Sequence, residues 1–210
     1  MSEAARIITC DEDVEAGAAW LAQKDARFAT ALALIGPVPL RLRPDGFHSL
    51  LDVIVSQQVS VASANAIRER MKQADLISPK AVLAAGEEGL RSAGLSRPKV
   101  RYAIALAEAD LDYAGLHDMQ DQLVRETLCA VKGIGPWSAQ IYLMFCMGRA
   151  DAFAAGDLAL QEAVKVLFGL EKRPTAEDLE EMSQDWSPWR SVAARVLFAY
   201  YRVMKNREGL

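Results

Sequence analysis

The segment Lys132-Gly133-Ile134-Gly135 combines residue types that could hold an anion. Glycine tolerates positive φ and lets a ligand approach the backbone closely, and an apolar residue between two glycines can anchor the turn in a core. Where a helix follows directly, its first amide groups point outward and favour a phosphate. The segment therefore indicates a phosphate-binding turn with added positive charge from Lys132. An ordinary connection between two helices, with Gly at the C-cap, is the alternative.

Cysteine and histidine offer little metal or disulfide chemistry in this chain. Cys10, Cys129 and Cys146 form no Cys-x-x-Cys pair and no metal-ligand spacing. Since His48 and His117 are the only imidazoles, a His-rich metal site is not expected either. We therefore expect free thiols in a reducing cytosol.

The net charge of −4 argues against a nucleic-acid partner at first sight, because phosphate neutralisation is the main source of DNA affinity. The acidic residues are concentrated, however, in residues 1–25 and 171–185, each with six acidic and two basic side chains. These two segments account for −8, so the remainder of the chain carries +4. This distribution is compatible with DNA and does not by itself predict it.

The sequence shows no secretory or membrane-spanning pattern. It does not open with a charged region followed by an apolar core. The longest uncharged runs, Phe28–Leu40 and Gly133–Gly148, are too short or too interrupted by Gly and Pro to span a bilayer. We expect a cytoplasmic protein, nucleoid-associated if the source is bacterial, with no membrane partner.

Helical periodicity dominates, and we predict an all-α fold of about ten helices in two lobes. No alternating run of β-branched residues and no hairpin of the Asn-Gly type is present. With 210 residues, about half of them apolar, the chain can bury a core of its own. The expected helices cover residues 14–34, 47–56, 60–71, 79–93, 96–111, 123–131, 137–147, 158–168, 175–182 and 188–204.

Two of these helices carry further local signals. From Phe47 to Val55 the apolar residues recur at helical spacing and form a stripe that we expect to be buried, whereas His48 falls off the stripe and should be solvated. Thr175 followed by Asp178 resembles a capping box, with Asp in place of Glu or Gln.

The segment Val131–Ala139 resembles the helix-hairpin-helix of the DNA-3-methyladenine glycosylase II family, within the helix-hairpin-helix DNA glycosylase superfamily. Three further segments agree in order with landmarks of that family: Ile54–Val61, Gly94–Lys99 and Trp186–Ser191. The similarity covers roughly residues 40–205. It implies one glycosylase domain, residues 1–210, whose hairpin motif (about 123–147) lies at a cleft for damaged double-stranded DNA. Longer relatives begin with a β-rich lobe, so this chain resembles a compact, monomeric form without it.

The same resemblance implies that Asp157 is the catalytic carboxylate, because an aspartate follows the hairpin by about twenty residues in this superfamily. Cleavage of an N-glycosidic bond builds positive charge on the sugar, which an ionised carboxylate stabilises. The same group could also activate the attacking water. Taken alone, Asp157 reads as a helix N-cap, and the two roles are compatible. Asp151 is the nearest rival acid, and Gly156 stands where some relatives carry a second one.

Trp137 indicates base removal without strand cleavage. Relatives that also nick the strand have at this position a lysine, which forms a Schiff base, and tryptophan cannot do so. The four-cysteine iron–sulfur loop of the endonuclease III relatives is also missing, since only three cysteines exist. We therefore expect a monofunctional DNA N-glycosylase with no iron–sulfur cluster.

The resemblance also implies a base pocket with aromatic walls, formed by Trp137, Phe198 and Tyr142. Alkylated purines such as 3-methyladenine and 7-methylguanine are cationic, and an indole face attracts a cation by roughly 0.5–2 kcal/mol. For each of these aromatic residues the alternative is core packing.

DNA contacts are carried over in the same way. Gln58 would fill the gap left by the flipped nucleotide, with Gln57 beside it, although a paired Gln turn is otherwise a polar surface loop. The backbone phosphates would be held by Lys132, Gly133, Gly135 and Ser138. Hairpins of the family often hold a Na⁺ or K⁺ ion on main-chain carbonyls, here those of Cys129, Val131 and Ile134.

We therefore expect a base excision repair enzyme that flips alkylated purines and removes them with water. Two alternatives remain open. The first is a glycosylase for an oxidised or deaminated base, because pocket shape sets that choice. The second is a non-catalytic DNA-binding module, which would need neither Asp157 nor an aromatic pocket.

Overall fold

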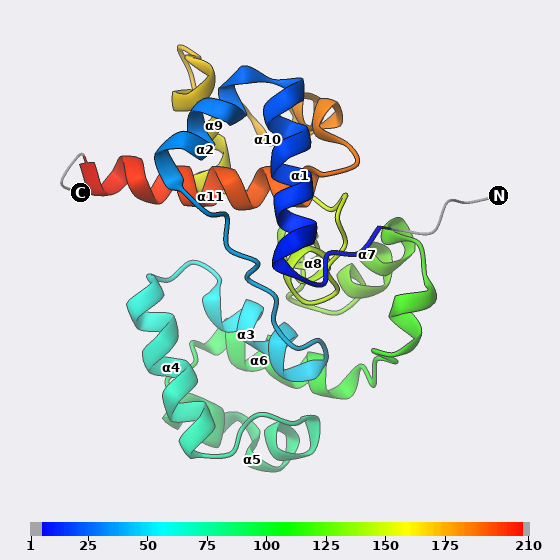
Figure 1. The fold of residues 1–210 in the computed structure, drawn as a ribbon. Helices are drawn as coiled ribbons and strands as arrows, with labels where there is room; N and C mark the ends of the chain where they lie inside the picture. Colours follow the sequence, from blue (N-terminus) through cyan, green and yellow to red (C-terminus); the bar gives the residue numbers. More distant parts are fainter. Residues whose placement is uncertain (1–5, 208–210) are drawn as a thin grey trace. The chain divides into compact units, whose positions relative to one another are not determined.

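The computed structural model describes residues 6–207, which form eleven α-helices and two short 3-10 helices (Figure 1). Within this range β-type pairing is limited to an isolated bridge between Ile7 and Arg149. The predicted all-α fold is thus confirmed. The chain divides into two compact units. The central unit is residues 43–147, and the terminal unit combines the described parts of residues 1–42 and 148–210.

The central unit is built around helix α3 (Phe47–Ser56), which packs against α4, α6 and α8. Its apolar stripe from Phe47 to Val55 is buried as predicted, and His48 is exposed. The other helices of this unit are α4 (Val61–Gln73), α5 (Pro79–Ser92), α6 (Arg97–Glu108), η1 (Gly115–Asp118), α7 (Asp121–Cys129) and α8 (Pro136–Phe145).

The terminal unit is organised on its longest helix, α11 (Arg190–Arg207), which packs against α1, α2 and α9. Phe28, Phe153 and Phe168 all contact the Trp186 ring, with ring centroids 5.4 to 5.9 Å apart. This aromatic cluster forms a large part of the core of the unit. The remaining helices are α1 (Asp11–Lys24), α2 (Ala26–Ile35), α9 (Leu158–Phe168), α10 (Ala176–Ser183) and η2 (Gln184–Trp186).

The long helix predicted over residues 14–34 is in fact two helices. Asp25 has extended backbone between α1 and α2, and its side chain accepts a hydrogen bond from the Arg27 amide at 2.9 Å. Asp25 therefore acts as an N-cap, which the apolar periodicity alone does not reveal. None of the helices described here has the length and apolar character needed to cross a membrane.

Candidate functional site

The predicted hairpin lies between α7, which ends at Cys129, and α8, which begins at Pro136. Gly133 has φ of +95°, and a Cβ atom there would overlap the ring of Tyr102. Gly135 has an extended backbone with φ of −101°, and no atom lies within 4 Å of where its Cβ would be. Only Gly133 is therefore required by the fold. The open space at Gly135 suits the close approach of a ligand to the backbone.

The start of α8 has the features of an anion site. Ile134 is buried and anchors the turn, whereas Lys132 is exposed. The first amide of the helix with a helical partner is that of Ala139, which bonds to the Gly135 carbonyl at 3.0 Å. The first turn of α8 therefore presents the positive end of the helix dipole at the hairpin.

Gln57 supports the hairpin from the end of α3. Its Nε2 donates to the Gly133 carbonyl at 2.9 Å and to Ser138 Oγ at 3.0 Å. Ser138, predicted to contact DNA, is 2% exposed as a whole residue, and its hydroxyl is engaged by Gln57. Gln58 is exposed and has φ of +54°. Of the two predicted glutamines, Gln58 is thus the one that faces solvent, and Gln57 holds the turn and the hairpin together.

A groove of about 680 Å³ lies within the central unit, between the Gln57–Val59 turn, the start of α6 and the hairpin. Lys99 lines this groove although it is 93% buried (7% exposed). Its Nζ donates to the Val55 carbonyl at 2.7 Å, near the end of α3. Burial lowers the pKa of Lys99. No sequence motif pointed to Lys99, although it lies four residues before the buried Ala103 on the apolar face of its helix.

In the terminal unit, Asp157 is the N-cap of α9. Its Oδ1 accepts hydrogen bonds from the amides of Ala159 at 2.8 Å and Leu160 at 3.3 Å, and the residue is half-buried. The N-cap role left open for Asp157 is therefore confirmed. Because both bonds are accepted by Oδ1, the cap fixes the direction of the carboxylate.

The turn before Asp157 is fixed by Gln161, which the sequence analysis did not identify. Gln161 is 6% exposed, and its Nε2 donates to the Ala155 carbonyl at 2.9 Å. The Asp157 amide donates to the Ala154 carbonyl, also at 2.9 Å. The backbone that carries the carboxylate is thus held on both sides.

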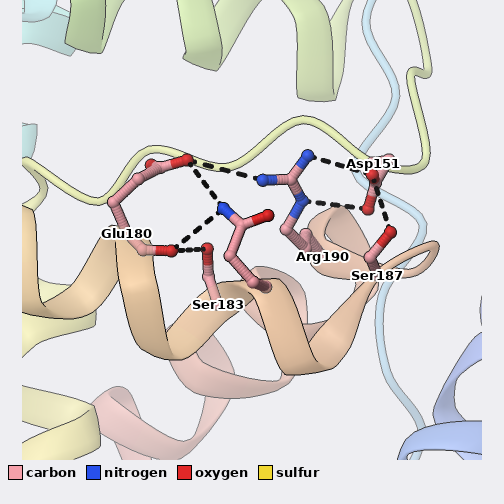
Figure 2. A network of polar contacts seen from close by, with 6 residues as sticks. Asp151, Glu180, Ser183, Ser187 and Arg190 are labelled. Carbon is pink, nitrogen blue, oxygen red and sulfur yellow. Dashed lines mark hydrogen bonds and ion pairs between the residues drawn. The ribbon is translucent and has the colours of Figure 1, made fainter.

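Asp151, the rival acid, has a structural role. Its carboxylate accepts hydrogen bonds from Arg190 Nε and Nη2 at 3.0 and 2.9 Å and from Ser187 Oγ at 3.0 Å, as Figure 2 shows. Arg190 also reaches Glu180 at 3.4 Å. This network ties the loop after Arg149 to the start of α11 and accounts for part of the Trp186–Ser191 landmark. It leaves Asp157 as the better candidate for chemistry.

The three predicted pocket aromatics differ in their surroundings. Tyr142 is fully buried in the central unit, and its hydroxyl accepts a hydrogen bond from the Gly46 amide at 2.7 Å. The pocket role predicted for Tyr142 is therefore not supported, and core packing, the alternative, is observed. Trp137 is half-buried on α8 of the central unit. Phe198 is half-buried on α11 of the terminal unit, with the Arg41 guanidinium carbon 5.5 Å from its ring centroid.

The main-chain carbonyls predicted to hold a monovalent cation lie at the end of α7 and in the hairpin. Helix α7 ends at Cys129, where the last carbonyls of a helix lack an intrahelical partner. The Val131 carbonyl accepts the Ile134 amide at 3.0 Å and retains a second lone pair. Carbonyl oxygens are donors that suit a hard monovalent cation, and the ion at this position stays a prediction. Among the described residues no group of three or more Cys, His, Asp or Glu side chains could hold a metal ion.

Comparison with known families and structures gives matches over most of the chain. The model of the HhH-GPD superfamily of base excision DNA repair proteins matches residues 51–188. The chain is 26% identical over 200 residues to the alkylbase DNA glycosidase-like protein mag2 of Schizosaccharomyces pombe, covering 90% of this chain and 94% of that protein.

Two solved structures are similar over nearly the whole chain. One is the 3-methyladenine DNA glycosylase Mag1 of Schizosaccharomyces pombe in complex with abasic DNA, with a TM-score of 0.78 and 26% identity. That match covers 87% of this chain and 94% of Mag1. The other is the DNA-3-methyladenine glycosidase of Bacillus halodurans, with a TM-score of 0.75 and 32% identity, covering 90% and 89% of the two chains.

Proposed function

Because the chain belongs to the HhH-GPD superfamily of base excision DNA repair proteins, we propose that it is a monofunctional DNA glycosylase that flips and excises alkylated purines from duplex DNA. The observation that carries this proposal is Asp157, a carboxylate fixed at the start of α9 and held by Ala159, Leu160 and the Gln161-braced turn. The names of the relatives, which include 3-methyladenine DNA glycosylases, support the substrate class.

The reaction needs a negative charge near C1′ of the flipped nucleotide. As the C1′–N bond breaks, its electron pair leaves with the base, and an oxocarbenium-like sugar remains. Asp157 would stabilise this cation, an effect whose removal costs about 10²–10³ in rate for preorganised groups of this kind. Water then bonds to C1′ and gives up its proton to Asp157 or to solvent, which leaves an abasic sugar.

The aromatic residues support a cationic substrate. A purine alkylated at N3 or N7 departs as a neutral base, so the pocket needs little acid catalysis. The Trp137 indole face would attract the cationic base by roughly 0.5–2 kcal/mol, and Phe198 would offer a second ring. Since Trp137 stands where strand-cleaving relatives have a lysine, no Schiff base forms and the strand stays intact.

Binding to the duplex is assigned to the hairpin and the adjacent turn. Lys132 and the backbone of Gly133 and Gly135 would hold phosphates, and the exposed Gln58 would fill the gap left by the flipped nucleotide. A Na⁺ or K⁺ ion on the hairpin carbonyls would add positive charge facing the phosphate. We propose that the protein acts as a monomer in the cytoplasm.

The test compares wild type with Asp157→Asn on duplexes that contain 7-methylguanine or 3-methyladenine, scoring released base and strand nicking separately. Asn is as good an N-cap as Asp, so the fold is kept while the charge is lost. We expect base release to fall at least about 10²-fold with DNA affinity retained, and no nicking without added alkali. Asp25→Asn is the matched control, because Asp25 is also an N-cap of the terminal unit, and we expect its activity to be unchanged.

Each other outcome contradicts a named part of the proposal. Equal base release by Asp157→Asn and wild type would mean that the carboxylate is misassigned. Release of a neutral oxidised or deaminated base at a rate similar to a cationic one would favour the alternative substrate class. DNA binding by wild type without release of any base from a panel of lesions would favour a non-catalytic module. Nicking in the absence of alkali would overturn the monofunctional assignment.

A further inference from the structure

The turn between α3 and α4, residues 57–60, holds Gln58 in a strained backbone conformation. Gln58 has φ of +54°, a value that costs free energy for a residue other than glycine. The turn contains no glycine or proline that would favour this backbone locally. Such strain persists only where the surrounding structure enforces it. The constraint on Gln58 must therefore come from the elements packed around the turn.

Lys99 of α6 reaches the last turn of α3. Its Nζ donates to the Val55 carbonyl at 2.7 Å, three residues before Gln58. The last carbonyls of a helix lack an intrahelical partner, and a cation there also stabilises the negative end of the helix dipole. Lys99 is only 7% exposed, however, and lysine is rarely buried because its charge loses water. Apolar side chains of similar volume often stabilise a fold as well as a buried charge does. The buried ammonium therefore points to a role of this hydrogen bond beyond stability.

Arg68 of α4 reaches the last turn of α3 from a second helix. Its Nη2 donates to the Ser56 hydroxyl, and its Nε lies 3.4 Å from a carboxylate oxygen of Asp52. The Arg68 side chain is 25% exposed, so its removal should cost less stability than that of Lys99. Helices α4 and α6 both pack against α3 (Figure 1). The two cations therefore hold the residues that lead directly into the strained turn.

We propose that Lys99 and Arg68 are positioning residues that hold the last turn of α3 so that Gln58 is presented to the gap left by a flipped nucleotide. The inference rests on the proposed DNA-glycosylase function. Neither cation needs to touch the substrate, because each acts through the backbone that leads into Gln58. A side chain on an ordered backbone loses less conformational entropy on insertion than one on a loose turn. Loss of either contact should let the Gln58 backbone relax toward negative φ, and insertion would then be less frequent.

The experiment is a double-mutant cycle between Lys99→Met and Gln58→Ala, measured as the single-turnover rate of base release from a duplex that contains 7-methylguanine. Methionine fills the space of the buried stem and removes the donor to Val55. We expect Lys99→Met to lower the rate about 10- to 10²-fold, the effect that a small misplacement has on an active site. In the Gln58→Ala background, where no long side chain is left to place, the same substitution should cost much less. Loss of rate by the same factor in both backgrounds would overturn the inference.

Arg70→Met is the matched control. Arg70 of α4 also donates to a main-chain carbonyl at the end of a helix, from its Nε to Ala93 at 2.8 Å, but the helix that ends there is α5. Thermal melting should show a loss of stability, and base release below the melting midpoint should keep the wild-type rate. If Arg70→Met loses as much rate as Lys99→Met, lower stability alone accounts for the effect and the positioning role is wrong.

Arg68→Met repeats the cycle with Gln58→Ala and keeps the inference testable if Lys99→Met does not fold. The same dependence on Gln58 is expected. Base release by wild type without coupling to Gln58 in either cycle would remove this inference and leave the glycosylase function standing.

A second measurement needs no chemistry. The fluorescence of 2-aminopurine placed beside a tetrahydrofuran abasic site in a duplex reports unstacking when a side chain is inserted. If wild type releases no base, the glycosylase function is contradicted and this signal decides the inference. A smaller rise on binding for Lys99→Met and Arg68→Met than for wild type and Arg70→Met would support the positioning role, and an equal rise for all four proteins would contradict it.

Discussion

At the scale of single residues, the two glycines of the hairpin differ in backbone conformation and surroundings. Gly133→Ala would place a methyl group against Tyr102 at φ of +95°, and we expect a loss of about 1–3 kcal/mol in the free energy of unfolding. Gly135→Ala places its methyl group in open space with extended backbone, so stability should stay within about 0.5 kcal/mol of wild type. Its DNA affinity should nevertheless fall, because the methyl group blocks the approach of a phosphate. Urea unfolding and anisotropy measure the two effects.

This pair of variants separates what the fold needs from what the ligand needs. Wild-type DNA affinity in Gly135→Ala would show that no phosphate approaches this backbone. Wild-type stability in Gly133→Ala would mean that the Tyr102 ring moves aside at little cost, so that the glycine there is not a requirement of the fold.

At the scale of the helix, α10 depends on a capping box that the sequence predicted. The Asp178 carboxylate accepts hydrogen bonds from the Thr175 amide at 3.0 Å and from its hydroxyl at 2.9 Å, and the Asp178 amide donates to Thr175 Oγ1 at 3.1 Å. The bonds from the Thr175 amide and hydroxyl lower the pKa of Asp178 below its ordinary value of about 3.8. A carboxyl group with a lowered folded pKa stabilises the protein above its unfolded pKa, and this contribution is lost as pH falls through the folded value.

We therefore expect Asp178→Ala to be less stable than wild type at pH 7, with a difference that becomes smaller as pH falls below about 3.8. Glu177→Ala is the control, since Glu177 lies in the same first turn and takes no part in the capping box. Urea midpoints at pH 7, 5 and 3 give the comparison. A deficit of Asp178→Ala that persists unchanged at pH 3 would mean that the ionised cap does not stabilise the helix.

Most helices and their starts were readable from the sequence because both are local, and the start of α2 at Asp25 was the exception. Thr175 caps its helix as predicted, and α9 spans residues 158–168 as predicted. The surroundings of a side chain were harder to read. Tyr142 lies on an apolar helix face, and periodicity shows that such a face is buried but not whether a core or a ligand covers it.

Long-range polar contacts were not readable at all. The bonds from Gln57 to Gly133 and from Lys99 to Val55 join residues 76 and 44 positions apart. No local propensity encodes such pairs, because they exist only once the helices have packed. They are also the contacts that hold the turn at Gln58 and the hairpin in place within the central unit. The polar contacts that support the candidate site are therefore the part of it that the sequence does not reveal.

At the scale of the whole molecule, buried titratable groups set the response to alkaline pH. In the central unit, burial raises the pKa of Cys146 to about 11, that of Tyr113 to about 12, and that of Tyr142 well above its ordinary value. A raised folded pKa gives stability that is present below the unfolded value, about 9 for the thiol and 10 for the phenols, and lost as pH rises. Arg195 of the terminal unit acts in the opposite sense. Burial and the nearby Arg41 charge lower its folded pKa to about 10, so loss of its proton above that pH removes a buried charge and favours the folded protein.

The raised pKa values of Cys146, Tyr113 and Tyr142 should outweigh the lowered values of Arg195 and Lys99, so the free energy of unfolding should fall between pH 8 and pH 10.5. Tyr142→Phe tests this. At pH 8 it should lose about 1–3 kcal/mol, because the Gly46 amide is left unsatisfied. Its decline toward pH 10.5 should be shallower than that of wild type, since one phenol no longer ionises on unfolding. Equal slopes for Tyr142→Phe and wild type in urea unfolding would mean that ionisation of Tyr142 is not what weakens the protein in alkali.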